Sequence, residues 1–163
     1  MERFFSVQTK DGKVYKINRK AAELSGMLSE MKEVDDSLAI PLNDIDSKTI
    51  EKVIEYLTHF NGNKPQEIQK PLLSTDMKKI TDEWSAEFID KLSIEEIVNL
   101  TASAHYFKID CLLNLCCAKI VSLCKGKSES DIFKIFGVPE NYFSSEQKEK
   151  IKENYPWVND IFQ

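Results

Sequence analysis

The alternation of apolar and polar side chains that marks a β-strand is confined to the first 42 residues, and this confinement restricts the fold more than any other feature. Residues 5–9 alternate as a half-buried strand does, and the Asp11-Gly12 pair that follows is a strong hairpin turn signal. Residues 14–17 predict the returning strand. Residues 37–42 predict a short third strand, which Pro41 limits to a sheet edge or a strand end.

Helical periodicity dominates the rest of the chain, where apolar residues recur every three or four positions. Most of the predicted helices begin at a recognisable capping residue. Strands first and helices afterwards predict a segregated α+β architecture. We predict one or two short helices within 19–31 and another short helix at 84–90. Three longer helices are predicted to be capped by Asp46, by the Ser93–Glu96 capping box and by Asp110. Two further short helices are predicted to begin at Ser128 and at Ser144 or Ser145.

The length and composition suit one domain, or one domain with an added segment, because 42% of the 163 residues are hydrophobic. The formal net charge of −5 is spread along the chain without a basic stripe, so nucleic-acid binding is not expected. No apolar run approaches the roughly 20 residues that span a bilayer, so no membrane segment is expected. The start of the chain lacks an apolar signal segment, which favours a reducing compartment, cytoplasmic and nuclear.

The residues that usually carry chemistry are few and poorly spaced. A zinc site needs about four converging ligands, whereas the chain has two histidines and no pair of cysteines at the i, i+4 spacing. We therefore expect no metal and no cofactor, and we interpret the cysteines as free thiols acting as small core residues. A nucleophilic Cys111 beside His105 is the one enzymatic alternative. The four cysteines lie close together, at Cys111, Cys116, Cys117 and Cys124, with Cys116 and Cys117 expected to face inward.

Residues 61–83 interrupt the helical pattern. Asn61-Gly62 stops the preceding helix, the acidic and basic residues of the segment balance, and it contains no Phe or Tyr. We predict a long surface loop that is mobile or poorly packed.

The last 37 residues hold a surplus of aromatic rings. The chain has 2 Trp, 5 Tyr and 9 Phe, and the segment 127–163 holds seven of them. Two short helices cannot readily enclose so many rings. The rings either dock on the preceding domain or form an apolar surface for a partner. They are Phe133, Phe136, Tyr142, Phe143, Tyr155, Trp157 and Phe162.

Several motifs in a fixed order resemble those of one family. The most specific stretch runs from Ala104 to Ile109, Ala-His-Tyr-Phe-Lys-Ile, and is followed by Leu112-Leu113. Others are Asp11-Gly12, Ile40-Pro41-Leu42, Lys52-Val53-Ile54 with Thr58-His59, Trp84 with Glu87-Phe88, and Lys152-Glu153-Asn154 with Trp157. Together they resemble the S-phase kinase-associated (Skp) adaptors of SCF cullin-RING ubiquitin ligases, within the BTB/POZ superfamily.

The resemblance implies a BTB/POZ core over residues 1–126, with a small three-stranded sheet and helices, and a C-terminal helical extension over 127–163. The core would bind a cullin through His105 and Tyr106, the extension would bind F-box proteins, and no residue would be catalytic. The free protein is a candidate homodimer. The expected F-box-binding residues are Ile132, Phe136, Val138, Phe143, Ile151 and Trp157.

The sequence departs from the family's usual pattern in several places that bear on function. The region from Lys16 to Met27 is shorter than the family's usual form, His105 stands where the family usually has Asn, and residues 61–83 replace an acidic loop with a neutral one. An elongin C-like adaptor is an alternative within the same fold, although that protein lacks the extension. A BTB self-association module is a second alternative.

Overall fold

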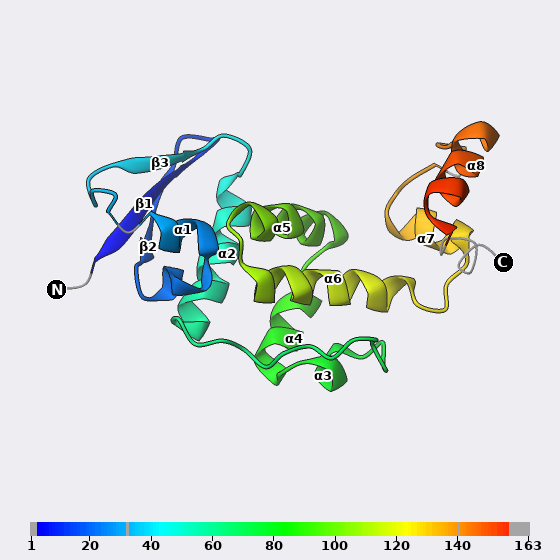
Figure 1. Cartoon of the computed structure of the whole chain (residues 1–163), viewed down its shortest axis with the longest axis horizontal. Helices are drawn as coiled ribbons and strands as arrows, with labels where there is room; N and C mark the ends of the chain where they lie inside the picture. The colour runs from blue at the N-terminus through cyan, green and yellow to red at the C-terminus, as the bar shows by residue number, and fades with distance from the viewer. Residues whose placement is uncertain (1–2, 32, 140, 157–163) are drawn as a thin grey trace.

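The computed structural model describes residues 3–31, 33–139 and 141–156. A small sheet lies at one end of the molecule, a group of helices lies in the middle, and two further helices lie at the other end (Figure 1). The strands come from the first 42 residues, and every later element in the described ranges is helical. The predicted α+β class is therefore confirmed.

The sheet has the order β2-β1-β3 and contains both kinds of pairing. β1 (Phe4–Thr9) pairs antiparallel with β2 (Val14–Asn18) across the predicted hairpin, in which Gly12 takes a φ of +82°. β3 (Ala39–Leu42) adds to β1 in parallel at the sheet edge. Pro41 is tolerated there because an edge strand leaves one row of amides without a strand partner.

Two short helices connect the second and third strands, as predicted. The 3-10 helix η1 (Ala21–Leu24) is followed by α1 (Gly26–Glu30), whose first turn is capped by the Ser25 hydroxyl. Asp46 caps α2 (Ser47–Phe60) by accepting the Thr49 N–H at 2.8 Å, which confirms its predicted role. The cap satisfies one of the backbone donors that begin every helix without a partner.

The prediction for residues 61–83 is wrong in its C-terminal part. The short helix α3 (Met77–Ile80) forms there, and Met77 is only 2% exposed because it packs into the main core. Leu72 is half-buried against the same core, whereas Leu73 is 85% exposed. The predicted helix at 84–90 is confirmed as α4 (Glu83–Asp90), capped by Asp82.

The two central helices form a hairpin. α5 (Ile94–Tyr106) begins with the predicted Ser93–Glu96 capping box. α6 (Asp110–Cys124) differs from the prediction, because Ile109 occupies the cap position and Asp110 is the first helical residue. Asp110 still suits the positive end of the helix dipole. Cys116 is buried as predicted, but Cys117 is exposed, because α6 turns that side of its wide apolar surface away from the core.

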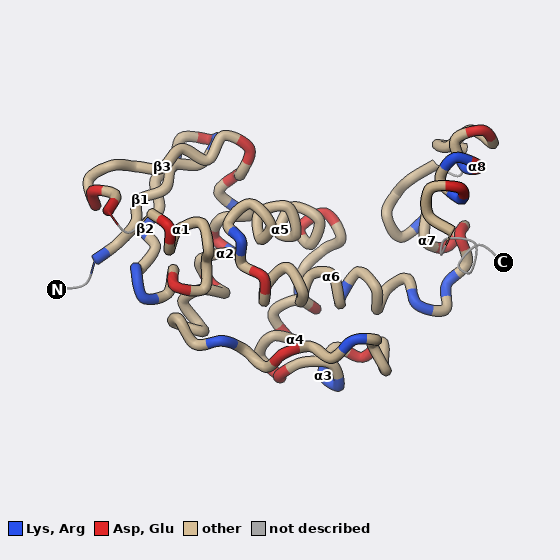
Figure 2. The backbone as a smooth tube through the Cα atoms, viewed as in Figure 1, with Lys and Arg blue, Asp and Glu red and all other residues tan. Residues whose placement is uncertain are grey.

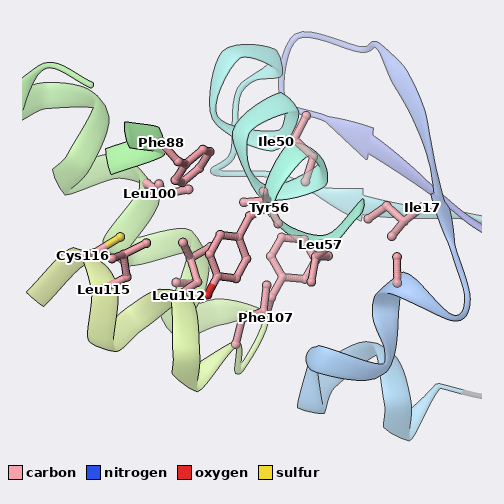
Figure 3. Packing of buried hydrophobic residues seen from close by; sticks show 14 of the residues in the cluster. Ile17, Ile50, Tyr56, Leu57, Phe88, Leu100, Phe107, Leu112, Leu115 and Cys116 are labelled. Atoms are coloured by element: carbon pink, nitrogen blue, oxygen red, sulfur yellow. The ribbon is translucent and has the colours of Figure 1, made fainter. Parts of the chain in front are cut away.

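The core lies where α2, α4, α5 and α6 meet, and it extends to the sheet through Phe5, Val7 and Ile17. Figure 3 shows Tyr56 and Leu57 of α2 pointing toward Phe107 and Leu112, and all four are at most 1% exposed. Trp84 stacks on Phe88 with ring centroids 5.1 Å apart, next to Tyr56. Burial of each large apolar side chain stabilises the fold by roughly 1.5–3 kcal/mol before entropy is counted.

The extension contains α7 (Glu129–Ile135) and α8 (Ser145–Asn154). Both short helices were predicted, and Ser128 and Ser144 cap them. Figure 1 shows them apart from the sheet and from α2, beyond the C-terminal end of α6. No residue of α7 or α8 is buried. The described rings of the extension therefore stay outside the main core.

Charged residues of both signs are interspersed along the described chain (Figure 2). Among the described residues, no helix is both long enough and apolar enough to span a bilayer.

Candidate protein-interaction surfaces

The first surface is built on the turn between α5 and α6. The Phe107 carbonyl oxygen accepts the Ser25 hydroxyl at 2.6 Å and the Met27 N–H at 3.2 Å. The Lys108 carbonyl oxygen accepts the Gly26 N–H at 3.0 Å. The first turn of α1 thus supplies donors that would lack a partner within the helix and uses them to hold this turn.

The turn approaches α1 so closely that a side chain in place of Gly26 would be crowded. A Cβ atom on Gly26 would lie 3.0 Å from the Lys108 Cβ, so the Lys108 side chain would have to shift slightly. Lys108 has a positive φ of 52°, which is uncommon for a residue with a side chain. The Lys108 ammonium group also pairs with Glu30 of α1 at 3.0 Å. These contacts fix the backbone of the turn, and so they also position the residues that immediately precede it, His105 and Tyr106.

His105 and Tyr106 lie on that fixed turn with their side chains exposed. Tyr106 is 49% exposed, while the neighbouring Phe107 is fully buried and holds the Tyr106 ring in an edge-to-face contact at 5.3 Å. Both residues line a groove of about 450 Å³. The predicted pair is therefore brought together on one surface. The groove is also lined by Lys10, Pro41, Leu42, Asn43, Asp44, Ile45, Asp46, Thr49, Asn99, Ala102 and Ser103.

The groove mixes charges of both signs. Lys10 and His105 line it together with Asp44 and Asp46. The hydrogen bond from the Thr49 backbone N–H holds the pKa of Asp46 below its usual range, so this carboxylate remains ionised. Residues 41–46, which form one wall of the groove, were not predicted from the sequence. They are far from α5 along the chain and come next to it only in the folded structure.

The second surface is the extension. Ile132 and Phe136 are one turn apart, and the Phe136 N–H donates to the Ile132 carbonyl oxygen at 3.1 Å. Phe143 lies 6.5 Å from Phe133 between ring centroids and 5.0 Å from Tyr142. All of these side chains are half-buried except Tyr142, which is 65% exposed.

The predicted F-box residues are therefore brought together only in part. The Val138 N–H donates to the Phe133 carbonyl oxygen at 2.8 Å just after the end of α7, and both Val138 and Ile151 of α8 are half-buried. Trp157 lies outside the described residues. Phe133 is not among the predicted site residues, but it belongs to the same ring cluster and to the aromatic surplus of this segment. Lys148 lies 6.0 Å above the Phe133 ring centroid and is the polar edge of the cluster.

The burial of Cys116 and the positions of Cys111 and His105 bear on the enzymatic alternative. Burial raises the pKa of the Cys116 thiol to about 12, so it is a poor nucleophile at neutral pH. His105 lines the groove beside β3, whereas Cys111 lines a separate cavity with Tyr56. Within the described ranges, no cluster of three or more His, Cys, Asp or Glu side chains could hold a metal ion.

A small sheet followed by helices, with a groove at His105 and Tyr106 and an appended apolar surface, defines a protein-interaction domain of the BTB/POZ type. Residues 3–62 match the tetramerisation domain of the Skp1 family, and residues 110–158 match the dimerisation domain of the same family. The second match begins at the first residue of α6, so it joins that helix to the extension.

Full-length comparisons agree with the domain matches. The chain is 30% identical over 144 residues to the S-phase kinase-associated protein 1 homolog of Tetrahymena thermophila, covering 88% of this chain and 84% of the relative. This chain belongs to the Skp1 family. It is 29% identical over 157 residues to the E3 ubiquitin ligase complex SCF subunit sconC of Arthroderma otae, covering 95% and 94%. It is 27% identical over 157 residues to suppressor of kinetochore protein 1 of Schizosaccharomyces pombe, covering 92% and 94%.

Proposed function

We propose that this protein is a non-catalytic adaptor subunit of an SCF-type E3 ubiquitin ligase. The groove at His105 and Tyr106 binds a cullin, and the extension binds the F-box of a substrate receptor. The names of two relatives, an SCF subunit and an S-phase kinase-associated protein, support this assignment.

The observation that carries the proposal is the separation of two exposed surfaces by one helix. His105 and Tyr106 precede the first turn of α6, and the extension follows its last turn. A helix of this length spans about 22 Å at 1.5 Å per residue. Two partners therefore bind at opposite ends of α6 without competing for the same surface.

The extension favours this proposal over an elongin C-like adaptor. Ile132, Phe136 and Phe143 are all left half-buried, and no described residue of α7 or α8 is fully enclosed. Apolar side chains in that state gain free energy when a partner covers them, at about 25 cal/mol per Å² of apolar surface. An F-box helix bundle supplies a cover of that kind.

The test is reconstitution with a cullin N-terminal domain and an F-box domain. The double variant His105→Ala/Tyr106→Ala should weaken cullin binding about tenfold or more, since central aromatic residues often contribute about 2 kcal/mol. The double variant Ile132→Ala/Phe136→Ala should weaken F-box binding to a similar degree. Each variant serves as the control for the other partner, with titration calorimetry as the measurement.

Both variants should keep the melting temperature of the core. Equal loss of both partners in either variant would show that the substituted residues are structural. Binding of neither partner by the unmodified chain would overturn the adaptor assignment itself.

A further inference from the structure

Residues 62–76, here called the strap, run from the end of α2 to α3 and touch α6 on the way (Figure 1). The Lys70 ammonium group of the strap donates to the Asn114 side-chain oxygen of α6 at 3.1 Å. The Lys125 ammonium group donates to the Leu72 carbonyl oxygen of the strap at 2.7 Å. The strap is thus the hydrogen-bond donor in the first bond and the acceptor in the second.

The two anchoring positions lie on the same side of α6. Asn114 and Lys125 are separated by just over three helical turns, or about 16 Å along the axis. The strap is therefore clamped at two points along the length of α6. On the strap the two bonds are only two residues apart, at Lys70 and Leu72, so together they hold this part of the strap along α6.

Few other contacts hold the strap in place. Ile68 and Leu72 are half-buried against the main core, and Leu73 is 85% exposed. Strap residues 64–68 and the side chains of Tyr56 and Cys111 line a cavity of about 630 Å³. A segment with sparse packing has low local stability, so each of its specific bonds has a large share in its order.

Lys125 is also the residue at which α6 ends. Its N–H donates to the Val121 carbonyl oxygen, and Gly126 follows with a φ of +73°. The Lys127 N–H then donates to the Cys124 carbonyl oxygen at 3.0 Å, and Ser128 caps α7. Because the connection between α6 and α7 is so short, the direction of the last turn of α6 determines the position of α7.

We propose that the strap is a brace for the end of α6, and that Lys125 and Lys70 are positioning residues for the partner-binding extension. By holding the last turn of α6, the strap fixes the exit of the chain and pre-orders the extension for its partner. A pre-ordered surface loses less entropy on binding, which strengthens the complex. The link to the F-box rests on the proposed function, whereas the bracing itself does not.

The brace is tested first in the free chain by amide hydrogen exchange. Lys125→Met removes the bond to Leu72 and should speed exchange about fivefold over residues 119–128, the last turn of α6 and the turn that follows it, as the loss of one hydrogen bond of about 1 kcal/mol would. Lys125→Arg retains a donor and should restore slow exchange. Lys127→Met is the matched control, because it removes the same charge from an exposed position two residues further on.

The second measurement is the affinity for an F-box domain and for a cullin N-terminal domain. Lys125→Met should weaken F-box binding about three- to tenfold and leave cullin binding unchanged. Adding Lys70→Met should weaken F-box binding only slightly further, because the loss of one of the two bonds already frees the strap.

Unchanged exchange in Lys125→Met would overturn the brace. Weaker F-box binding with unchanged exchange over residues 119–128 would also overturn it, since Lys125 would then contact the partner directly. An unmodified chain that binds no F-box would refute the adaptor function, while the exchange comparison would still decide the brace.

Discussion

The core and the extension use apolar side chains in opposite ways. In the core, Leu57, Phe107 and Leu112 are fully enclosed, whereas no residue of α7 or α8 is buried. Both regions have well-capped helices, and the extension is the richer of the two in aromatic residues. Local helix signals therefore do not distinguish a self-sufficient region from one that leaves its apolar surface for a partner. The difference lies in what covers each side chain.

The largest expected effect tests this contrast with one substitution in each region. Phe107→Ala should lower the free energy of unfolding by about 3–5 kcal/mol, because it deletes a fully buried ring and leaves a cavity. Phe136→Ala should lower it by about 1 kcal/mol or less, because the ring is only half-buried. Urea unfolding followed by far-UV circular dichroism measures both. Similar losses in the two variants would mean that the extension is part of the cooperative core.

The comparison also shows how far sequence reasoning reaches. The hairpin at Gly12, the cap at Asp46 and the capping box at Ser93 were all predicted, because each depends on neighbours within a few residues. Cys117 was assigned to the wrong side of α6. Apolar residues cover most of the circumference of that helix, so its sequence pattern does not define one inward direction.

The candidate surfaces were predictable only in part for the same reason. The exposed pair His105 and Tyr106 followed from a family motif, but the wall that faces them comes from residues 41–46. The bond from Ser25 to Phe107 joins residues 82 apart, and the bond from Lys125 to Leu72 joins residues 53 apart. No local pattern in the sequence records such pairs. Met77 was missed because its helix is a single turn long.

A smaller effect compares two capping boxes of the same design. Ser93 and Glu96 open α5 in the core, and Ser144 and Gln147 open α8 in the extension. Replacing either serine by alanine removes a cap worth about 1 kcal/mol. Ser93→Ala should reduce the global free energy of unfolding by about that amount. Ser144→Ala should instead speed amide exchange within α8 about fivefold and leave global unfolding nearly unchanged.

Two measurements on both variants, urea unfolding and hydrogen exchange, separate these outcomes. A global loss in Ser144→Ala would show that α8 unfolds together with the core.

The smallest effect concerns the acid sensitivity of the core. Asp11 of the β1–β2 hairpin accepts the Ser47 hydroxyl and the Ser47 N–H, the latter at 3.2 Å, and so ties the sheet to the first turn of α2. The hydrogen bond from the Ser47 side chain is the main reason that the pKa of Asp11 is lowered to about 2. The unfolded chain binds this proton near pH 4, before the folded chain does. Asp11 therefore stabilises the fold above about pH 4, and this contribution is lost as the pH falls toward 2.

Asp11→Asn should remove that contribution, so the variant should be slightly less stable at pH 7 and should lose less stability between pH 4 and 2 than the unmodified chain. The effect is small because the carboxylate is exposed to solvent and screened. Glu129→Gln is the matched control, because Glu129 pairs with Lys148 at 3.4 Å within the extension. That variant should leave the acid dependence of core unfolding unchanged. An identical acid slope in Asp11→Asn and the unmodified chain would show that the hairpin tie does not contribute to the pH dependence of the core.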